Sequence, residues 1–256
     1  MNMTLGTRLI KIPLVLLLLC VMVSVRPLHA AETIIIVRGQ DFPPYHYRND
    51  AGIQTGYIID VIRAVGARLD VTVTFHQHSW SKCLEMVKKG RADAMMNLFK
   101  TPERDTFMWF ANNILGYEVN RFYKRRTTGL TYTGKFQDLF PLKMGVIRNY
   151  SYGKRFDRTH FPHKVELETE RELLNALVNN RCDIVLANDV VFNAFIRQSK
   201  LESRIVSLSP EVSNEPLYLG FSKALGHQGL AESFSTTLED LKQSGEYNRI
   251  LKQYGF

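Results

Sequence analysis

In the N-terminal part of the chain, strand-like and helix-like hydrophobic patterns alternate, and this alternation constrains the fold more than any other feature. Residues 33–38 form a β-branched apolar run, residues 58–69 have helical spacing, and residues 71–75 alternate apolar with polar side chains. A helix is then predicted over residues 81–89 and a short buried strand over residues 94–96. Such alternation implies βαβ units and a sheet that helices cover on both faces.

A second cycle of the same kind starts after residue 123. The pattern predicts strands over residues 143–147, 164–167 and 182–187, with a helix from Ser151 onward and another over residues 170–179. The two cycles share a sequence before their last strands, since Gly-Arg-Ala-Asp in the first corresponds to Asn-Arg-Cys-Asp in the second. Each of these segments combines a helix C-cap, an arginine, a small residue and an aspartate. We therefore expect two lobes of similar build.

The C-terminal part returns to a strand pattern over residues 217–221, followed by an amphipathic helix over residues 230–244 and a short last helix. If the first lobe ends near Val119 and the chain comes back to it near Ser213, two connecting segments join the lobes as a hinge. We expect an α/β fold of two lobes, each a sheet flanked by helices. The expected bounds are residues 31–119 and 214–256 for lobe 1, and residues 120–213 for lobe 2.

Residues 1–30 have the pattern of a secretory signal peptide. Arg8 and Lys11 precede an apolar run over residues 12–25, and Ala30 provides a small residue at the expected cleavage point. The run is shorter than the roughly 20 residues that span a bilayer, so an uncleaved anchor is the less favoured alternative. We expect an exported, soluble mature chain of about 226 residues.

Charge and cysteine content limit the classes of partner. Loss of residues 1–30 removes three basic residues and no acid, so the formal charge falls from +8 to +5. We interpret the basic cluster at residues 124–126 as a solvated turn, with a docking surface as the alternative, and expect no nucleic-acid partner. Two cysteines, Cys83 and Cys182, remain in the mature chain. We expect two buried free thiols in separate lobes, and a disulfide formed in an oxidising compartment is the alternative.

The segment after the third predicted strand carries the first candidate for ligand binding. The apolar run stops at Asn97, and Thr101 with Pro102 predicts the N-cap and first residue of a helix. Ligands of open α/β sheets bind at the carboxyl ends of strands, so Asn97, Thr101 and Arg104 are expected at one edge of a crevice. Arg104 is then a candidate clamp for an anion. The alternative is a solvated helix residue paired with a neighbouring acid.

In order and spacing, these residues resemble the periplasmic solute-binding proteins of polar amino acid ABC transporters, a two-lobed family that closes over its ligand. The likeness runs from about residue 33 to residue 256. It rests on Asp41 to Tyr45, Gly52, Gly56, Tyr57, Asp60, Trp80, Gly90, Asp93, Thr101 to Arg104, Phe110, Gly145, Val146, Asp183, Leu219 to Lys223 and residues 245–256. The resemblance implies the type 2 periplasmic-binding fold, a periplasmic location, capture of a small solute and its delivery to an inner-membrane permease.

The resemblance also implies roles for residues of the first lobe. It assigns the ligand carboxylate to Arg104, whose planar guanidinium offers two parallel donors. Thr101 and the main chain near Asn97 and Leu98 are expected to add donors or acceptors. Two aromatic residues, Phe42 and Trp80, are expected to flank the ligand, with core packing as the alternative for Trp80.

In the second lobe the resemblance is less complete. Ser151 corresponds to a hydroxyl residue that begins a helix and binds the same carboxylate, although it could simply cap that helix. The family's acid for the ligand ammonium lies five residues after the strand aspartate, and that position holds Asn188, followed by Asp189. Asparagine can accept a hydrogen bond from ammonium but cannot neutralise it, whereas Asp189 does both if the strand end shifts. A zwitterionic amino acid is the expected ligand, and a carboxylate without an amino group, a small peptide or a related metabolite is the alternative.

Other chemistry has little support in the sequence. The histidine pairs at residues 76/78 and 160/163 lack further ligands at a motif spacing, so we expect no metal site. No nucleophile elbow, phosphate loop or dinucleotide fingerprint is present, and we expect a monomer without a cofactor or enzyme activity. Two alternatives stay open. One is an enzyme similar to cyclohexadienyl dehydratases, which requires a general acid that the sequence does not mark, and the other is a ligand-sensing protein that acts through a partner.

Overall fold

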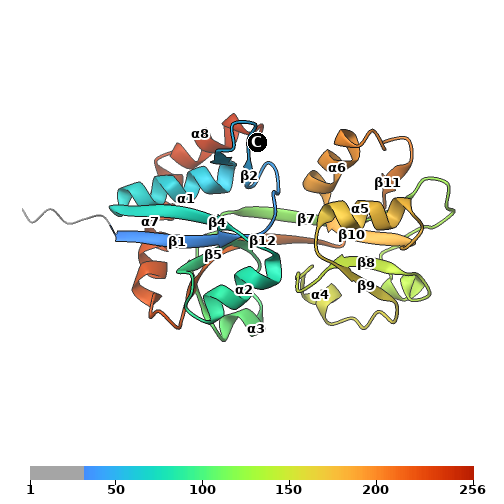
Figure 1. Cartoon of the computed structure of the whole chain (residues 1–256), viewed down its shortest axis with the longest axis horizontal. Helices are drawn as coiled ribbons and strands as arrows, with labels where there is room; N and C mark the ends of the chain where they lie inside the picture. Colours follow the sequence, from blue (N-terminus) through green and yellow to red (C-terminus); the bar gives the residue numbers. More distant parts are fainter. Residues whose placement is uncertain (1–31) are drawn as a thin grey trace, which may run out of the picture. The chain divides into compact units, whose positions relative to one another are not determined.

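The computed structural model describes residues 32–256, so the predicted signal peptide lies outside the described residues. A mixed sheet runs through these residues and helices lie on both of its faces (Figure 1). The strand order is β4 (Val71–Gln77), β1 (Glu32–Arg38), β5 (Ala94–Leu98), β12 (Ser213–Ser222), β7 (Gly116–Arg125), β10 (Ile184–Asn188), β8 (Met144–Ile147) and β9 (Lys164–Leu167). The short strands β6 (Met108–Phe110) and β11 (Ile205–Ser207) pair with β12 and β7.

The two ends of this sheet have the same topology. In lobe 1, β1 lies between β4 and β5, and all three strands are parallel. In lobe 2, β8 lies between β9 and β10, again all parallel. The spatial order is thus second, first, third in both lobes, and one antiparallel strand completes each, β12 in lobe 1 and β7 in lobe 2. The predicted α/β fold of two similar lobes is confirmed.

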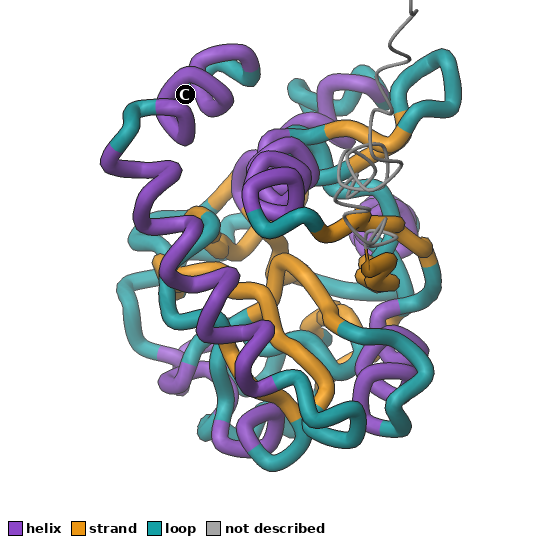
Figure 2. Tube along the Cα trace, turned by 90° about the vertical axis from the view of Figure 1, so that its left-hand side faces the viewer, coloured by secondary structure: helices purple, strands orange, loops and turns teal. Residues whose placement is uncertain are grey.

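Helices cover the faces of both lobes, and Figure 2 views lobe 1 end-on with its strands between helices. Lobe 1 carries α1 (Tyr57–Arg68), α2 (Trp80–Lys88), α3 (Pro102–Asp105), α7 (Gln228–Gln243) and α8 (Glu246–Gln253). Lobe 2 carries a 3₁₀ helix (Phe136–Leu139), α4 (Lys154–Asp157), α5 (Glu170–Val178) and α6 (Asp189–Gln198). A small hairpin lies within the long loop after β1. Its two strands, β2 (Tyr47–Arg48) and β3 (Gln54–Thr55), have two residues each.

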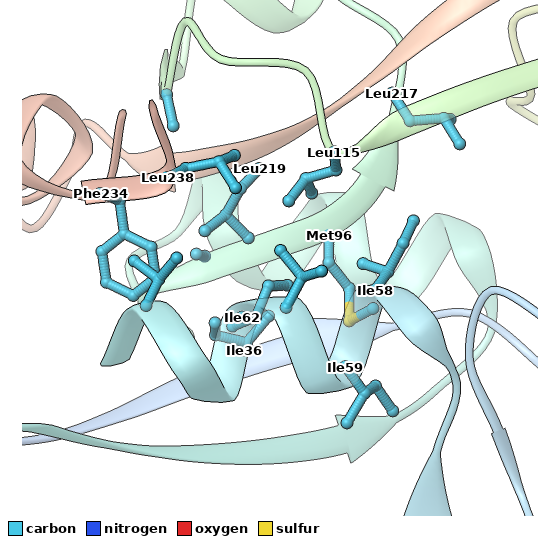
Figure 3. Packing of buried hydrophobic residues seen from close by; sticks show 14 of the residues in the cluster. Ile36, Ile58, Ile59, Ile62, Met96, Leu115, Leu217, Leu219, Phe234 and Leu238 are labelled. Atoms are coloured by element: carbon cyan, nitrogen blue, oxygen red, sulfur yellow. The ribbon is translucent and has the colours of Figure 1, made fainter. Parts of the chain in front are cut away.

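The core of lobe 1 follows from the helical spacing of α1. Its buried face packs on the sheet and against α7, and the central residues of this cluster are Ile36, Ile58, Ile59, Ile62, Met96, Leu115, Leu217, Leu219, Phe234 and Leu238 (Figure 3). Complete burial of each large aliphatic side chain contributes about 1.5–3 kcal/mol, so this face fixes α1 on the sheet of lobe 1.

The repeated segment of the sequence has the same structural role in both lobes. A carboxylate oxygen of Asp93 accepts a 2.7 Å hydrogen bond from the main-chain N–H of Ile35. The equivalent Asp183 accepts one of 2.8 Å from the N–H of Lys143. Each aspartate therefore ties the start of its own strand to the neighbouring parallel strand, which explains why the segment recurs.

Two antiparallel strands, β7 and β12, connect the lobes within residues 32–256, which form one structural unit. In their register Asn120 lies opposite Ser213, and Val119 lies opposite Asn214. The predicted lobe bounds fall at these paired positions, in the middle of β7 and at the start of β12. The bounds themselves stay a prediction.

One predicted element is wrong and several were not predicted. The helix expected from Ser151 onward begins only at Lys154 and has four residues. Gly153, with φ of 96°, precedes it, and the carboxylate of Asp157 accepts hydrogen bonds from Ser151 and from the N–H of Tyr152, which holds this turn out of the helix. Strands β6, β7 and β11, the β2–β3 hairpin and helix α6 were absent from the predicted pattern.

The two cysteines of the described part are free and buried, as predicted. The Cys83 thiol donates to the carbonyl oxygen of Arg38 at 3.1 Å, and Cys182 packs in the core of lobe 2. Among residues 32–256, every helix is too short or too polar to cross a membrane.

Candidate functional site

A small chamber lies where the carboxyl ends of β1 and β5 meet the loop that follows β8. Its volume is about 20 Å³, and it has side chains of both lobes and of the connecting strand β7 in its wall. The lining residues are Gly39, Phe42, His46, Trp80, Asn97, Leu98, Phe99, Arg104, Glu118, Tyr150 and Ser151. This is the position at which open α/β sheets bind ligands, because the carboxyl ends of the parallel strands converge there.

The structure brings most of the predicted site residues together. Phe42, Trp80, Asn97, Leu98, Arg104 and Ser151 all line the chamber. Thr101 lies at the adjoining outer groove, described below, and its hydroxyl accepts a 3.2 Å hydrogen bond from the N–H of Arg104 as the N-cap of α3. Asn188 and Asp189 line neither space.

Arg104 is held in a buried position on α3. Only 5% of the residue is exposed, so the alternative of a solvated helix residue is wrong. Its guanidinium donates to the carbonyl oxygen of Phe99 at 2.9 Å and to that of Asn149 at 3.3 Å, and lies 5.5 Å from the centre of the Trp80 ring. Burial lowers the pKa of Arg104 to about 10, so it stays charged at neutral pH. No carboxylate of residues 32–256 lies within 4.0 Å of this guanidinium.

Trp80 lines the chamber and also contacts residues of the other lobe. It begins α2 and is 8% exposed, and its indole nitrogen donates to the carbonyl oxygen of Asn149 at 2.9 Å. The Tyr150 ring stands edge-on to it, with centroids 4.5 Å apart. Trp80 also packs with Cys83 and Met95 in a core cluster. The side chain is therefore both part of the core and part of the chamber wall, the two positions expected for it.

A buried acid, Glu118, also lines the chamber and was not predicted from the sequence. It lies on β7, where Gly116, Glu118, Asn120 and Phe122 alternate as buried positions. Burial raises the pKa of Glu118 to about 8, with the nearby Glu170 adding to the effect. The sequence signal available was this alternation, which places two polar side chains on the inner face of a strand between apolar residues.

Two further polar groups in the chamber wall lack a partner among residues 32–256. They are the amide oxygen of Asn97 and Nδ1 of His46, both fully buried. Burial, with the positive charge of Arg38 as a second cause, lowers the pKa of His46 to about 3, so this imidazole is neutral at pH 7. Buried polar atoms without partners cost about 1–3 kcal/mol each, and these two atoms are free to form hydrogen bonds with a polar group placed in the chamber.

The structure gives Asn188 and Asp189 partners within the protein. The side-chain oxygen of Asn188 accepts from the N–H of Val191 at 2.9 Å, as the N-cap of α6. Asp189 accepts from the Tyr123 hydroxyl at 2.6 Å and forms a 3.2 Å ion pair with Arg121. Their predicted contact with a ligand ammonium stays a prediction, and this arrangement gives it no support.

An outer groove of about 850 Å³ adjoins the chamber. Phe99, Arg104, Tyr150 and Ser151 line both spaces and therefore stand at the passage between them. Side chains of α2 and α3 form one side of the groove, and residues of β8, α4 and β9 form the other. Among residues 32–256, no three histidine, cysteine or acidic side chains lie together in a way that could hold a metal ion.

Comparisons with known proteins identify the family of the chain. Residues 34–256 match the family described as Bacterial extracellular solute-binding proteins, family 3. The Putative ABC transporter arginine-binding protein 2 of Escherichia coli (strain K12) is 22% identical over 234 residues, covering 88% of this chain and 91% of that protein. The L-cystine-binding protein TcyJ of Bacillus subtilis (strain 168) is 22% identical over 231 residues, covering 88% and 84%.

Solved structures show the same fold. An ancestral arginine-binding protein bound to arginine matches with a TM-score of 0.77 and 20% identity, covering 89% of this chain and 100% of that chain. A histidine kinase sensor domain with similarity to periplasmic binding proteins matches with a TM-score of 0.78 and 22% identity, covering 87% and 96%. The predicted family is confirmed: the chain belongs to family 3 of the bacterial extracellular solute-binding proteins, whose relatives named above include binding proteins of amino acid ABC transporters.

Proposed function

We propose that this protein binds a small solute with a carboxylate group, an amino acid in the first place, between its two lobes, and that Arg104 takes the carboxylate. The observation that carries the proposal is the buried guanidinium in the wall of the chamber, without a carboxylate of residues 32–256 within 4.0 Å. A buried charge is costly unless it is paired. A ligand carboxylate would supply the missing negative charge with two parallel hydrogen bonds.

Binding requires the lobes to move, because the chamber has room for about one water molecule. An amino acid fits only if Asn149 and Tyr150 draw away from α2. Strands β7 and β12 are the two crossings about which such an opening would turn. Reclosure would exclude water and strengthen the pairing between Arg104 and the ligand.

The family supports a role in transport. The relatives are named as arginine-, histidine- and cystine-binding proteins, and one is named as periplasmic. We infer that this protein is exported to the periplasm, binds its solute as a monomer and passes it to an ABC permease in the inner membrane. Because these relatives bind different amino acids, the names support the class of ligand and not one compound.

A thermal-shift panel tests the proposal. The twenty common amino acids and L-cystine are added to the purified mature protein, and each hit is retested as the amide that lacks a free carboxylate. A bound ligand raises the melting temperature with its concentration over its Kd. We expect at least one amino acid to raise the melting temperature and its amide to have no effect. Equal shifts by both forms would refute the carboxylate contact.

One observation favours a second candidate, an enzyme similar to cyclohexadienyl dehydratases. Such an enzyme needs a general acid beside its substrate, and Glu118, with its raised pKa, is a protonated acid in the chamber wall at neutral pH. Incubation with prephenate and with arogenate separates the two functions. Formation of an aromatic product by the wild type, and its loss in the E118Q variant, would establish the enzyme.

A further inference from the structure

We propose that the carboxyl group of Glu118 receives the cationic group of the ligand, so that the chamber recognises a zwitterion between Arg104 and Glu118. The inference rests on the proposed function, because it assigns the second half of the same site. It also replaces the expectation that Asn188 or Asp189 takes this role.

The placement of Glu118 is the first argument. It belongs to the connecting strand β7, is 6% exposed, and lines the same chamber as Arg104. No lysine, arginine or histidine of residues 32–256 forms an ion pair with it within 4.0 Å. By contrast, Asp189 already has Arg121 and Tyr123 as partners. Glu118 is therefore a buried acid of the chamber wall that has no cation of its own.

The second argument is independent of this acid. The amide oxygen of Asn97 is buried in the same wall and accepts no hydrogen bond from residues 32–256. An ammonium group has three N–H donors and needs several acceptors. A carboxylate and an unpaired amide oxygen in the same wall suit it, whereas an apolar or anionic ligand group would leave the Asn97 oxygen without a donor.

The groups around Glu118 determine its charge in the absence of ligand. The groups that lie close enough to influence it, or that line the same chamber, are Arg104 from α3, Glu170 from α5, the neutral His46, the amides of Asn120 and Asn188, and the tyrosines Tyr45, Tyr57, Tyr150 and Tyr152. Burial and Glu170 favour the protonated acid, while the two amides and Arg104 favour the carboxylate. Burial dominates, so the pKa rises to about 8.

A proton balance follows from this. At pH 7 an acid with this pKa holds about 0.9 proton, and a cation placed against it favours the carboxylate. The O–H bond of Glu118 then breaks, and its proton passes to the buffer. While the free ligand is itself a zwitterion, binding should therefore release up to about 0.9 proton at pH 7, and the release should fall toward zero as the pH approaches 9.

Calorimetry on the E118Q variant tests the inference. The probes are the amino acid that binds most tightly in the thermal-shift panel and the carboxylic acid that lacks only its α-amino group. The amide introduced by this substitution keeps the shape of the protonated acid, so the variant should fold with little change in melting temperature at pH 7. Glu232→Gln, an exposed acid on α7, is the matched control. Titrations in phosphate and in Tris buffer, which differ in ionisation enthalpy, count the protons released.

We expect E118Q to bind the amino acid at least about 30-fold more weakly, the lower limit for loss of one partner of a buried charge pair. Affinity for the deaminated acid should be unchanged, and proton release should disappear. Affinity for the amino acid within threefold of wild type, or an equal loss for both probes, would overturn the inference and leave the Arg104 proposal standing. A selective loss of affinity for the amino acid in the Asp189→Asn variant, and not in E118Q, would also overturn the inference. If no panel amino acid binds the wild type, both proposals fail.

Discussion

The indole nitrogen of Trp80 donates a 2.9 Å hydrogen bond to the main-chain carbonyl oxygen of Asn149, and this contact joins helix α2 of lobe 1 to the loop after β8 in lobe 2. Arg104 donates to the same oxygen at 3.3 Å, and the Asn149 amide donates to the Ser81 hydroxyl at 2.9 Å. A single residue of lobe 2 therefore touches three residues of lobe 1 at the chamber. We expect ligand entry to loosen these contacts.

Trp80 should report ligand binding by its fluorescence. The chain has two tryptophans, and the second, Trp109, is 36% exposed on β6, where Lys223 lies over its ring. We expect the W109F variant to keep a ligand-dependent change in emission, because the surroundings of Trp80 change when the chamber fills. The W80F variant should lose it. A ligand signal that follows Trp109 instead would place the binding event elsewhere.

Stability should fall as the pH rises from 6.5 to 8.5. Burial raises the pKa of Glu118 to about 8 and that of Glu170 to about 7, so between the ordinary value near 4.3 and these values the folded state holds more protons than the unfolded state. Each group lowers the free energy of unfolding by at most ~1.4 kcal/mol per pH unit in this range. His46, whose pKa is lowered, acts in the opposite direction but only below about pH 6.5.

The E118Q variant isolates one of the two contributions. It should show a shallower fall across the same pH window and should be more stable than the wild type at pH 8.5, as measured by urea unfolding. The E232Q control should follow the wild type. Parallel curves for wild type and E118Q would contradict the assignment of a protonated Glu118 to the unligated state.

Both thiols of the mature chain should be inert in the native state. Cys83 and Cys182 are fully buried, and burial raises the pKa of the Cys83 thiol to about 12. Because the thiolate is the reactive form, a disulfide reagent such as DTNB should detect no thiol in the native protein and two after unfolding in urea without a reductant. No thiol after unfolding would show that the two cysteines form a disulfide.

A single methyl group at Gly56 should destabilise lobe 1. Gly56 has φ of 118°, a conformation that side chains with a Cβ rarely adopt, and a Cβ there would lie 2.4 Å from the carbonyl oxygen of Tyr45. Both the strain and the clash act on the loop that carries Phe42 and His46. We expect Gly56→Ala to reduce the free energy of unfolding by about 1–3 kcal/mol. Gly229→Ala, on α7 with open space around its Cβ position, is the control and should have no such effect.

The sequence predicted most of the fold because the hydrophobic period changes clearly between elements. Strands β1, β5 and β8 are short apolar runs, β4 alternates apolar with polar residues, and helices α1, α5 and α7 carry their apolar residues at helical spacing. Strand β7 was missed because its inner face carries Glu118 and Asn120 between apolar residues, a mixture that propensity does not favour in a strand. Helix α6 begins directly at the end of β10, so its cap, Asn188, is also the last residue of a strand and no loop signal separates the two elements.

The candidate site was predicted where local motifs determine it and missed where tertiary contacts do. Thr101 and Pro102 fix the start of α3, and this places Arg104 at the end of β5. Glu118 comes from a strand that crosses between the lobes, and Tyr150 from a loop of lobe 2, so only the packing of distant segments brings them to Arg104. No spacing along the chain contains that information.

Calorimetric titration of the R104A variant tests the central claim most directly. The ligand is the amino acid that gives the largest thermal shift with the wild type, and Arg249→Ala, an exposed arginine on α8, is the matched control. The account predicts that R104A binds about 30- to 5,000-fold more weakly, which corresponds to ~2–5 kcal/mol for removal of one partner of a buried charge pair, while the control binds as the wild type does. Unchanged affinity in a folded R104A variant would contradict it.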